Sequence, residues 1–297
     1  MLDVFFLSMG ESGSEENWQR LLEFAPNAKR VKDVVGIFNA HRVCATLSST
    51  ENFWVVDADA WIVDGFDFSW QPDANIMHWN VPETQCISVW KSINPVNELT
   101  YGYGGVKLFP RKPFIKKHTW EIDMSTSLVD ITISRDSVSC ETRFNHTPES
   151  AWIGAFRECA KLASLSTIKL RIRKSLEKQQ VELEQLLENV NTLDYSDEGK
   201  VNYLNVQRFF IADRYKEETS IFSYWQEIEN NNANRLAWCT RGWNQPNGPY
   251  SVMGAREGTV FGLQNSDNLK QLNLINDWKW LKEKFKNVNI QYQFTEK

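Results

Sequence analysis

Two aspartates that directly follow an apolar stretch are the residues best suited to bind a metal ion. Asp57 and Asp59 are two residues apart and come after the apolar run 53–56. Two carboxylates at the end of a buried strand are costly to place unless a cation neutralises them. Mg²⁺ and Mn²⁺ prefer oxygen ligands and often hold a nucleoside diphosphate as well. The pattern therefore predicts a Mg²⁺ or Mn²⁺ site, and two exposed turn aspartates are the alternative.

The segment that leads to these aspartates alternates between strand-like and helix-like patterns. In order, its segments are 3–8, 14–25, 31–38, 39–48 and 53–56. Alternating strands and helices are typical of the α/β class, in which helices cover a parallel sheet. Because such sheets bind ligands at the carboxyl ends of their strands, we expect a ligand at Asp57 and Asp59.

The same region resembles the nucleotide-sugar half of a GT-A glycosyltransferase. The resemblance begins with Asn-Ala-His-Arg at 39–42 and Phe-Trp-Val-Val-Asp-Ala-Asp at 53–59. Further matching segments lie at 90–97, 101–110, 145–149, 155–162 and 275–278. Together they are similar to the phage-encoded TET-associated glycosyltransferases, which place sugars on hydroxymethylated bases of phage DNA. The resemblance covers residues 2–164 and 236–286.

The resemblance implies a single GT-A-like domain with a central, mostly parallel sheet flanked by helices. It implies a nucleotide-sugar and acceptor core at 1–164, a helical insertion at 165–235 and a return to the core at 236–297. The implied reaction is metal-dependent transfer of arabinose or glucose from a UDP-sugar to the hydroxymethyl group of a modified pyrimidine in phage DNA. A glycan or protein acceptor and a non-catalytic DNA-binding relative are the alternatives.

The resemblance also implies roles for individual residues. Asp59 is expected to bind the metal directly, and Asp57 to contact the ribose or to complete the metal shell through water. His146 is a candidate third metal ligand, and a loop histidine is its alternative. The residues expected to contact the UDP-sugar are Asn39, His41, Arg42, Asp57, Tyr103, Gly104, Gly105 and Lys107.

An inverting transfer also requires a general base for the acceptor hydroxyl. In some relatives acidic residues follow the glycine pair, but Val106 and Lys107 occupy those positions here. The candidate bases are therefore Glu149 and Asp123. Because Glu149 directly precedes a predicted helix at 151–163, its alternative role is a first-turn acid that interacts with the helix dipole. A retaining mechanism would need neither residue.

The charge distribution indicates where DNA would bind. The net charge of -5 gives no overall attraction to nucleic acid, but five basic residues and no acidic residue lie between 99 and 120. A polyanion would bind such a cluster, and a flipped base would stack on an aromatic ring. A second basic cluster at 169–174 and solvated surface charges are the alternatives. The predicted contacts to DNA are Trp90, Arg111, Lys112, Lys116 and Lys117.

The insertion at 165–235 departs from the resemblance. Leucines at helical spacing within 169–193 predict a long amphipathic helix, and 205–215 and 221–228 suggest two shorter ones that end at the asparagines 230–232. The insertion is interpreted as a lid, an acceptor-recognition module or an oligomer contact.

The cysteine content and the hydropathy pattern indicate the cellular compartment. The five cysteines are scattered and odd in number, which favours reduced thiols in the cytoplasm, or in the host cytoplasm for a phage-encoded chain. No stretch approaches ~20 apolar residues, so no membrane-spanning helix and no membrane partner are expected. The first residues lack the basic and apolar pattern of a secretory signal.

Overall fold

The computed structural model describes residues 1–102, 104–116, 125, 128–129 and 131–288. The chain divides into two compact units. Unit 1 consists of Met1–Ser164 and Ala233–Lys297, and unit 2 of Leu165–Asn232. These limits fall within three residues of the boundaries expected from the sequence. Among the described helices, none has the length and apolar character needed to cross a membrane.

Unit 1 contains the strands and most of the helices. Its strands are β1 (Asp3–Ser8), β2 (Lys29–Lys32), β3 (Asn52–Asp57), β4 (Ala60–Ile62), β5 (Met77–His78), β6 (Val81–Pro82), β7 (Ile87–Ile93), β8 (Thr100–Tyr101), β9 (Val106–Pro110) and β10 (Thr132–Thr142). Its helices are α1 (Ser14–Phe24), α2 (Ile37–Leu47), α3 (Arg111–Lys116), α5 (Pro148–Ser164), α9 (Gly248–Gln264), α10 (Leu269–Leu272) and α11 (Trp278–Lys286). Unit 2 contains α6 (Ser166–Val190) and α7 (Asp197–Thr219), and α8 (Trp225–Thr240) continues from unit 2 into unit 1.

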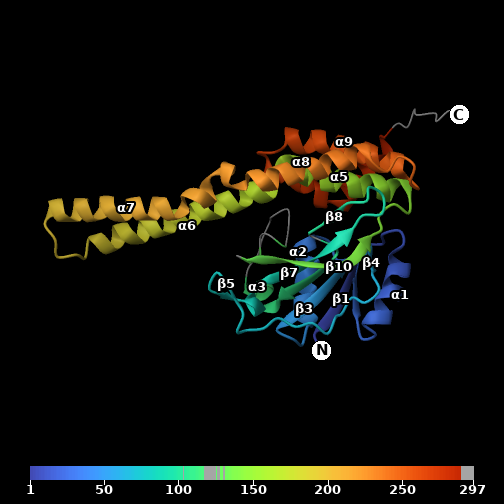
Figure 1. The fold of residues 1–297 in the computed structure, drawn as a ribbon, viewed down its shortest axis with the longest axis horizontal. Helices are drawn as coiled ribbons and strands as arrows, with labels where there is room; N and C mark the ends of the chain where they lie inside the picture. The colour runs from blue at the N-terminus through green and yellow to red at the C-terminus, as the bar shows by residue number, and fades with distance from the viewer. Residues whose placement is uncertain (103, 117–124, 126–127, 130, 289–297) are drawn as a thin grey trace. The chain divides into compact units, whose positions relative to one another are not determined.

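The main sheet is mixed and has the strand order β2-β1-β3-β9-β7-β10-β4, with β8 paired to β7 (Figure 1). β1 is parallel to β2 and β3, and β10 is parallel to β7. β9 is antiparallel to both β3 and β7, and β4 is antiparallel to β10. The α/β class is therefore confirmed, whereas the expected mostly parallel sheet is not confirmed.

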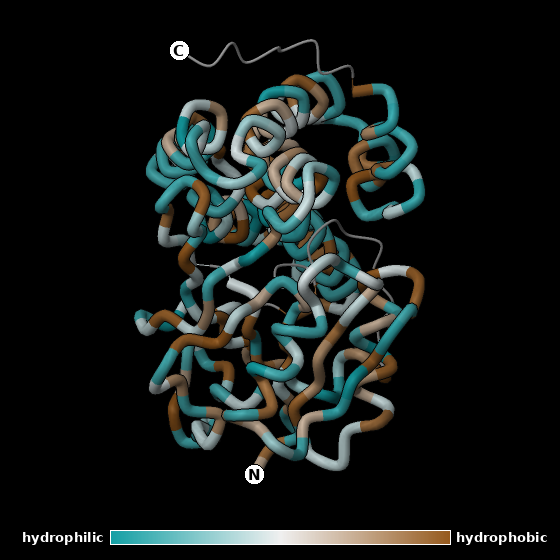
Figure 2. Tube along the Cα trace, turned by 90° about the vertical axis from the view of Figure 1, so that its right-hand side faces the viewer, coloured by the Kyte–Doolittle hydropathy of each residue, from teal (hydrophilic) through white to brown (hydrophobic). Residues whose placement is uncertain are grey.

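Successive residues of a strand point to opposite faces of the sheet. Helices pack on both of these faces. On one face, Phe6 and Trp54 pack with Leu21 of α1. On the other face, Phe53 packs with Phe114 of α3 and with apolar residues of α2. Figure 2, which colours each residue by hydropathy, shows apolar residues in the strands and in the helices alike. The continuous apolar run 53–56 thus forms a strand that is buried on both faces.

Helices α5 and α9 pack together through glycines. Gly254, Gly258 and Gly262 are four residues apart, so they lie along one face of α9. A Cβ atom on Gly258 would lie 2.8 Å from the carbonyl carbon of Phe156 in α5, and the other two glycines contact the α5 backbone as closely. These glycines therefore allow the two helix backbones to approach.

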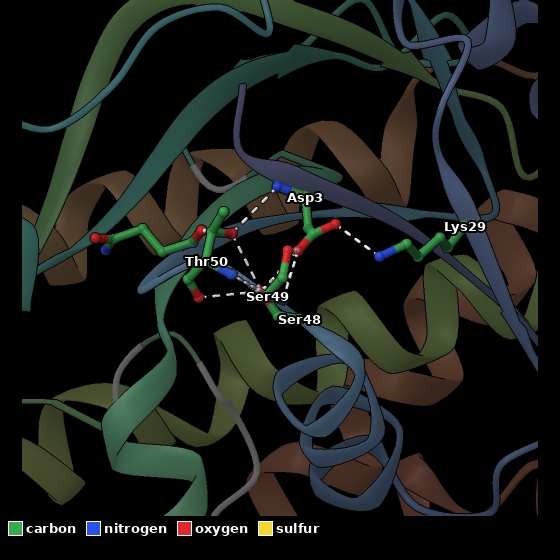
Figure 3. A network of polar contacts seen from close by, with 6 residues as sticks. Asp3, Lys29, Ser48, Ser49 and Thr50 are labelled. Carbon is green, nitrogen blue, oxygen red and sulfur yellow. Dashed lines mark hydrogen bonds and ion pairs between the residues drawn. The ribbon is translucent and has the colours of Figure 1, made fainter.

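Asp3 ties the start of β1 to the turn that follows α2 (Figure 3). Its carboxylate accepts hydrogen bonds from the Lys29 Nζ at 2.7 Å and from the Ser49 backbone nitrogen at 2.6 Å. Burial acts to raise the pKa of Asp3, but the hydrogen bonds from Lys29 and Ser49 together outweigh it and hold that pKa well below its usual range. This network fixes the edge of the sheet at which β1 begins.

In unit 2, α6 and α7 lie side by side (Figure 1). Leu186 of α6 is buried against Ile211 and Tyr215 of α7. Glu182 of α6 accepts a hydrogen bond of 2.7 Å from the Tyr215 hydroxyl and pairs with Arg214 at 2.8 Å. The expected long amphipathic helix is thus α6, and its partner α7 is twice as long as the short helix expected at 205–215.

Candidate functional site

Asp57 and Asp59 lie at the carboxyl edge of the parallel strands β2, β1 and β3, as expected. Three hydrogen bonds fix the loop that holds them. The Asp57 amide donates to the Gly105 carbonyl at 2.8 Å, and the Asp59 carbonyl accepts from the Arg143 amide at 2.6 Å. The Asn17 side chain of α1 donates to the Ala58 carbonyl at 2.8 Å. The two carboxylates are therefore held on a rigid loop.

Lys107 supplies the positive charge nearest to Asp57. It lies on β9, where it pairs with Val55 of β3. Its Nζ atom donates to the Asp57 Oδ2 at 2.7 Å, and both side chains are partly buried. Lys107 was expected to contact the UDP-sugar, and in the described structure it neutralises one of the two carboxylates.

Of the two aspartates, Asp59 is the one whose charged form is electrostatically unfavourable. Burial raises the pKa of Asp59 to about 7, and repulsion by Asp57 and by Glu11 adds to the effect. Lys107 and Arg157 act in the opposite direction but do not cancel it. Near neutral pH the Asp59 side chain is thus poised between its neutral and charged forms, and an added cation would favour the charged form.

Glu11 and Arg157 are charged neighbours that the sequence analysis did not assign. Glu11 follows β1, so it lies at the same sheet edge as Asp59, and burial raises its pKa. Arg157 of α5 donates to the Ile275 carbonyl at 2.8 Å and to the Asn276 side chain at 3.3 Å. A signal for Glu11 was its place directly after the first predicted strand. Arg157 lies in the matching segment 155–162, to which no role was given.

The donor set fits a hard divalent cation that completes its shell from a substrate. Within the described residues, no group of three or more His, Cys, Asp or Glu side chains is arranged to hold a metal ion. The chain therefore offers the two carboxylates of Asp57 and Asp59, with repulsion between them that a cation would relieve. Mg²⁺ in nucleotide sites is commonly bound by one or two carboxylates together with substrate phosphates and water.

His146, the candidate third ligand, lies in the segment between β10 and α5. Its ring packs against the backbone of Gly13, where an added Cβ would lie 2.6 Å from the ring carbon Cδ2. Among the described residues no group of three or more possible metal ligands includes His146, and its role as a third ligand stays a prediction. Its alternative, a loop histidine, describes the observed position between β10 and α5.

Gly104 and Gly105 allow the start of β9 to lie against the aspartate loop. A Cβ on Gly105 would lie 2.8 Å from the Cβ of Ala60 and 3.5 Å from that of Asp57. Gly104 donates its amide hydrogen to the Trp90 carbonyl at 2.8 Å. Close packing thus accounts for a glycine at both positions, in addition to the predicted contact with the sugar donor. Tyr103, also predicted to bind the donor, lies outside the described residues.

The three residues predicted on α2 have different environments. His41 is buried, and its ring packs edge-on against Phe109 at 5.0 Å and stacks on Phe114. Its prediction as a nucleotide contact is therefore wrong, because the ring belongs to the core. Asn39 is exposed in the first turn of α2, and Arg42 is exposed one turn later. Asn39 and Arg42 remain available to a ligand.

Trp90 does not offer its ring for stacking on a base. It is buried, and its ring centroid lies 4.6 Å from that of Trp54 in an aromatic cluster that also contains Trp70. The prediction that Trp90 contacts DNA is therefore wrong. A large aromatic residue in a strand can either fill the core or contact a ligand, and the sequence alone does not distinguish these two roles.

Two residues of the predicted basic cluster, Arg111 and Lys112, lie at the other end of the strands from the aspartates. Pro110, the last residue of β9, pairs with Asn52, the first residue of β3, because the two strands are antiparallel. The β3 strand separates the two ends by about 17 Å at the usual rise per residue. Arg111 donates to the Ala45 carbonyl at 2.9 Å and is partly buried, whereas Lys112 is exposed.

Because α3 begins at the edge opposite to the aspartates, Arg111 and Lys112 do not lie beside the candidate metal site, and their contact with DNA phosphates stays a prediction. Lys116 ends α3, and Lys117 lies outside the described residues.

Of the two candidate bases, Glu149 and Asp123, the structure describes only Glu149. Glu149 lies in the first turn of α5, and its Oε1 atom is 3.8 Å from the Nζ of Lys282 in α11. This ion pair and the helix terminus favour the structural alternative for Glu149. Asp123 lies outside the described residues.

No protein-family model matches this chain, and a search of curated proteins returned no significant match.

Proposed function

We propose that this protein transfers a sugar from a UDP-sugar, with Asp57 and Asp59 holding a divalent cation on the diphosphate. The observation that supports this most is the pair of carboxylates on one fixed loop at the carboxyl edge of the sheet, with the pKa of Asp59 raised to about 7. A nucleotide binds at this edge in many α/β proteins. When bound, the cation would neutralise the leaving diphosphate as charge develops on it.

The neighbouring residues would have distinct tasks in this reaction. Lys107 pairs with Asp57 and fixes its orientation through the 2.7 Å hydrogen bond. Arg157 contributes positive charge at Asp59 and is itself anchored by Ile275. A bound cation would favour the charged form of Asp59, so its raised pKa would make donor binding depend on pH.

For the acceptor we propose the hydroxymethyl group of a modified pyrimidine in DNA, with arabinose or glucose as the transferred sugar. This part of the proposal rests on the resemblance of the motifs. The target base would have to leave the stack for its hydroxyl to reach the donor. We also propose that the reaction takes place in the cytoplasm, since all five cysteines are free, which suits a reducing compartment.

A glycan or protein acceptor is the second candidate. It is favoured by the position of Arg111 and Lys112, which begin α3 at the sheet edge opposite to Asp57. A DNA acceptor at the aspartate edge would therefore need phosphate contacts other than these two residues.

The direct test is to incubate the protein with Mn²⁺, a panel of UDP-sugars and hydroxymethylated DNA, and then to weigh the digested nucleosides. The proposal expects a nucleoside that has gained one pentose or one hexose. Transfer to DNA should also fall steeply with salt, because phosphate contacts release counterions. Transfer to a glycan or peptide, without salt dependence, would select the second candidate. No transfer to any acceptor in Mn²⁺ would contradict both.

A further inference from the structure

The loop between α8 and α9 presents an exposed tryptophan beside two arginines. Trp243 is 37% exposed, and Arg241 and Arg256 are exposed as well. The Arg256 guanidinium lies 5.4 Å from the centre of the Trp243 ring, and its Nε donates to the Cys239 carbonyl at 3.1 Å. Arg256 is thereby fixed beside an aromatic ring that solvent reaches.

Hydrogen bonds connect this loop to the segment that holds the aspartates. The Asn247 side chain donates to the Asn145 carbonyl at 2.8 Å, and the Asn145 side chain donates to the Pro246 carbonyl at 3.0 Å. Arg143, two residues before Asn145, donates its amide hydrogen to the Asp59 carbonyl at 2.6 Å. The loop between α8 and α9 is thus held at the sheet edge where the two aspartates lie.

Gly242 fixes the backbone between the tryptophan and the first arginine. Its φ of +86° lies in the left-handed region, and an added Cβ would lie 2.5 Å from the Val96 carbonyl oxygen, so only glycine fits. Val96 belongs to the hairpin that follows β7. Because β7 and β3 are both antiparallel to β9, they run in the same direction, and this hairpin begins at the carboxyl edge of β3.

The charge of this region favours an anion. No Asp, Glu or Lys occurs from residue 230 to residue 256, and the charged side chains in that range are Arg235, Arg241 and Arg256. The next residue, Glu257, bonds to Trp152 and lies near Lys284. Glu98 of the hairpin is exposed and adds one negative charge. Three positive charges therefore stand against one negative charge.

The acids on the neighbouring elements have basic partners. Glu158 of α5 pairs with Lys161 at 2.8 Å. Glu141 of β10 pairs with Arg143 at 2.8 Å. The aspartate loop adds negative charge, which the proposed cation would offset.

We infer that the surface formed by Arg241, Trp243 and Arg256 binds the single strand of DNA that presents the acceptor base. This inference rests on the DNA acceptor proposed above. A base stacks on an exposed tryptophan ring, and guanidinium groups bind phosphates. At the aspartate edge, the surface supplies the phosphate contacts that Arg111 and Lys112 do not provide there. A tryptophan ring also suits a neutral glycan, but a neutral glycan gives no reason for two arginines beside it.

Binding of a labelled single-stranded oligonucleotide that carries hydroxymethylcytosine tests the inference by fluorescence anisotropy. Trp243→Ala should weaken binding by roughly tenfold, and Trp243→Phe should recover most of the affinity because it keeps a stacking ring. Arg241→Gln should weaken binding and reduce the slope of log Kd against log salt by about 1, since one phosphate contact is lost.

Matched controls make the same changes elsewhere. Trp79→Ala removes a tryptophan that is 88% exposed between β5 and β6, and Arg208→Gln removes an exposed arginine of α7. Both should bind DNA as the wild type does. UDP affinity in Mn²⁺ should be unchanged in every variant, and melting temperatures verify that each is folded.

The outcomes separate this inference from the proposed function. Wild-type DNA affinity in both Trp243→Ala and Arg241→Gln would overturn the inference, even where the protein transfers sugar to DNA. Lost affinity for a glycan in Trp243→Ala, with unchanged affinity for DNA, would also overturn it and assign the surface to a glycan. Weakened DNA binding in these variants of a protein that transfers no sugar would support the surface and contradict the proposed function.

Discussion

Lys107 of β9 reaches Asp57 at the end of β3, with 2.7 Å between its Nζ and the carboxylate Oδ2. This ion pair involves only one of the two aspartates in the loop. Asp57 has a fixed cationic partner, whereas burial and the repulsion by Asp57 raise the pKa of Asp59 to about 7. Asp59 is therefore the carboxylate whose charge would respond to a bound cation.

Asp59→Asn should abolish transfer and yet stabilise the fold above neutral pH. An acid whose pKa is higher in the folded state than in the unfolded state binds its proton more tightly when folded. Wild-type stability should therefore fall as the pH rises from about 4 to about 7. Because Asp59 is only partly buried, we expect the variant to gain about 1–3 kcal/mol at pH 8.

Urea unfolding at pH 5 and pH 8 measures this gain, and Asp136→Asn is the control because Asp136 is exposed beside Lys91. A variant that turned over at the wild-type rate would remove Asp59 from the metal site. A variant that was less stable at pH 8 would contradict the electrostatic account.

Glu149→Gln should leave kcat nearly unchanged. The carboxylate lies in the first turn of α5 and 3.8 Å from Lys282, so its loss should cost about 0.3–1 kcal/mol of stability. Measuring kcat and the melting temperature on the same preparation separates the two roles. A fall in kcat of roughly 10²–10⁴-fold with an unchanged melting temperature would instead make Glu149 the general base.

Asp3 should contribute to acid sensitivity. Hydrogen bonds from Lys29 and Ser49 hold its folded-state pKa below the unfolded value, so its stabilisation is complete above about pH 4 and is lost as the pH falls further. Asp3→Asn should therefore be less stable than the wild type at pH 7 by about 1–2 kcal/mol, and the difference should shrink towards pH 2. A difference that stayed constant across this range would show that the carboxylate charge is not involved.

Gly258→Ala should strongly destabilise unit 1. The added Cβ would lie 2.8 Å from the carbonyl carbon of Phe156, and backbone atoms cannot rotate away as a side chain can. We expect a loss of about 2–3 kcal/mol from this overpacking. Val260→Ala, at an exposed position of the same helix, should change stability by less than about 0.5 kcal/mol. Equal effects of the two substitutions would refute close packing of α5 and α9.

The aspartate loop was predictable because its signal is local. An uninterrupted apolar run predicts a buried strand, and two acids at its end must lie at the carboxyl edge whatever the rest of the chain does. The antiparallel direction of β9 was not predictable in this way, since it depends on pairing between Asn52 and Pro110, 58 residues apart in the sequence. Because β9 is antiparallel to β3, Arg111 and Lys112 lie at the sheet edge opposite to Asp57 and Asp59.

His41 and Trp90 show a second limit. Their residue types suit a ligand site and a core equally well, and their burial depends on neighbours such as Phe109 and Trp54. The asparagines 230–232 illustrate a third limit. They were expected to end a helix, but α8 continues through them to Thr240 because asparagine is only a moderately poor helix former and tertiary packing overrides it.

The binding of UDP to the wild-type protein, measured by calorimetry with and without Mn²⁺, tests the central claim most directly. The account predicts binding that requires Mn²⁺ at pH 8 and that weakens by roughly tenfold at pH 6, where Asp59 holds its proton. Asp59→Asn should lose the Mn²⁺-dependent part of the affinity, since an amide cannot supply the missing charge. Equal UDP affinity with and without Mn²⁺, in the wild type and in Asp59→Asn alike, would contradict a metal site at these aspartates.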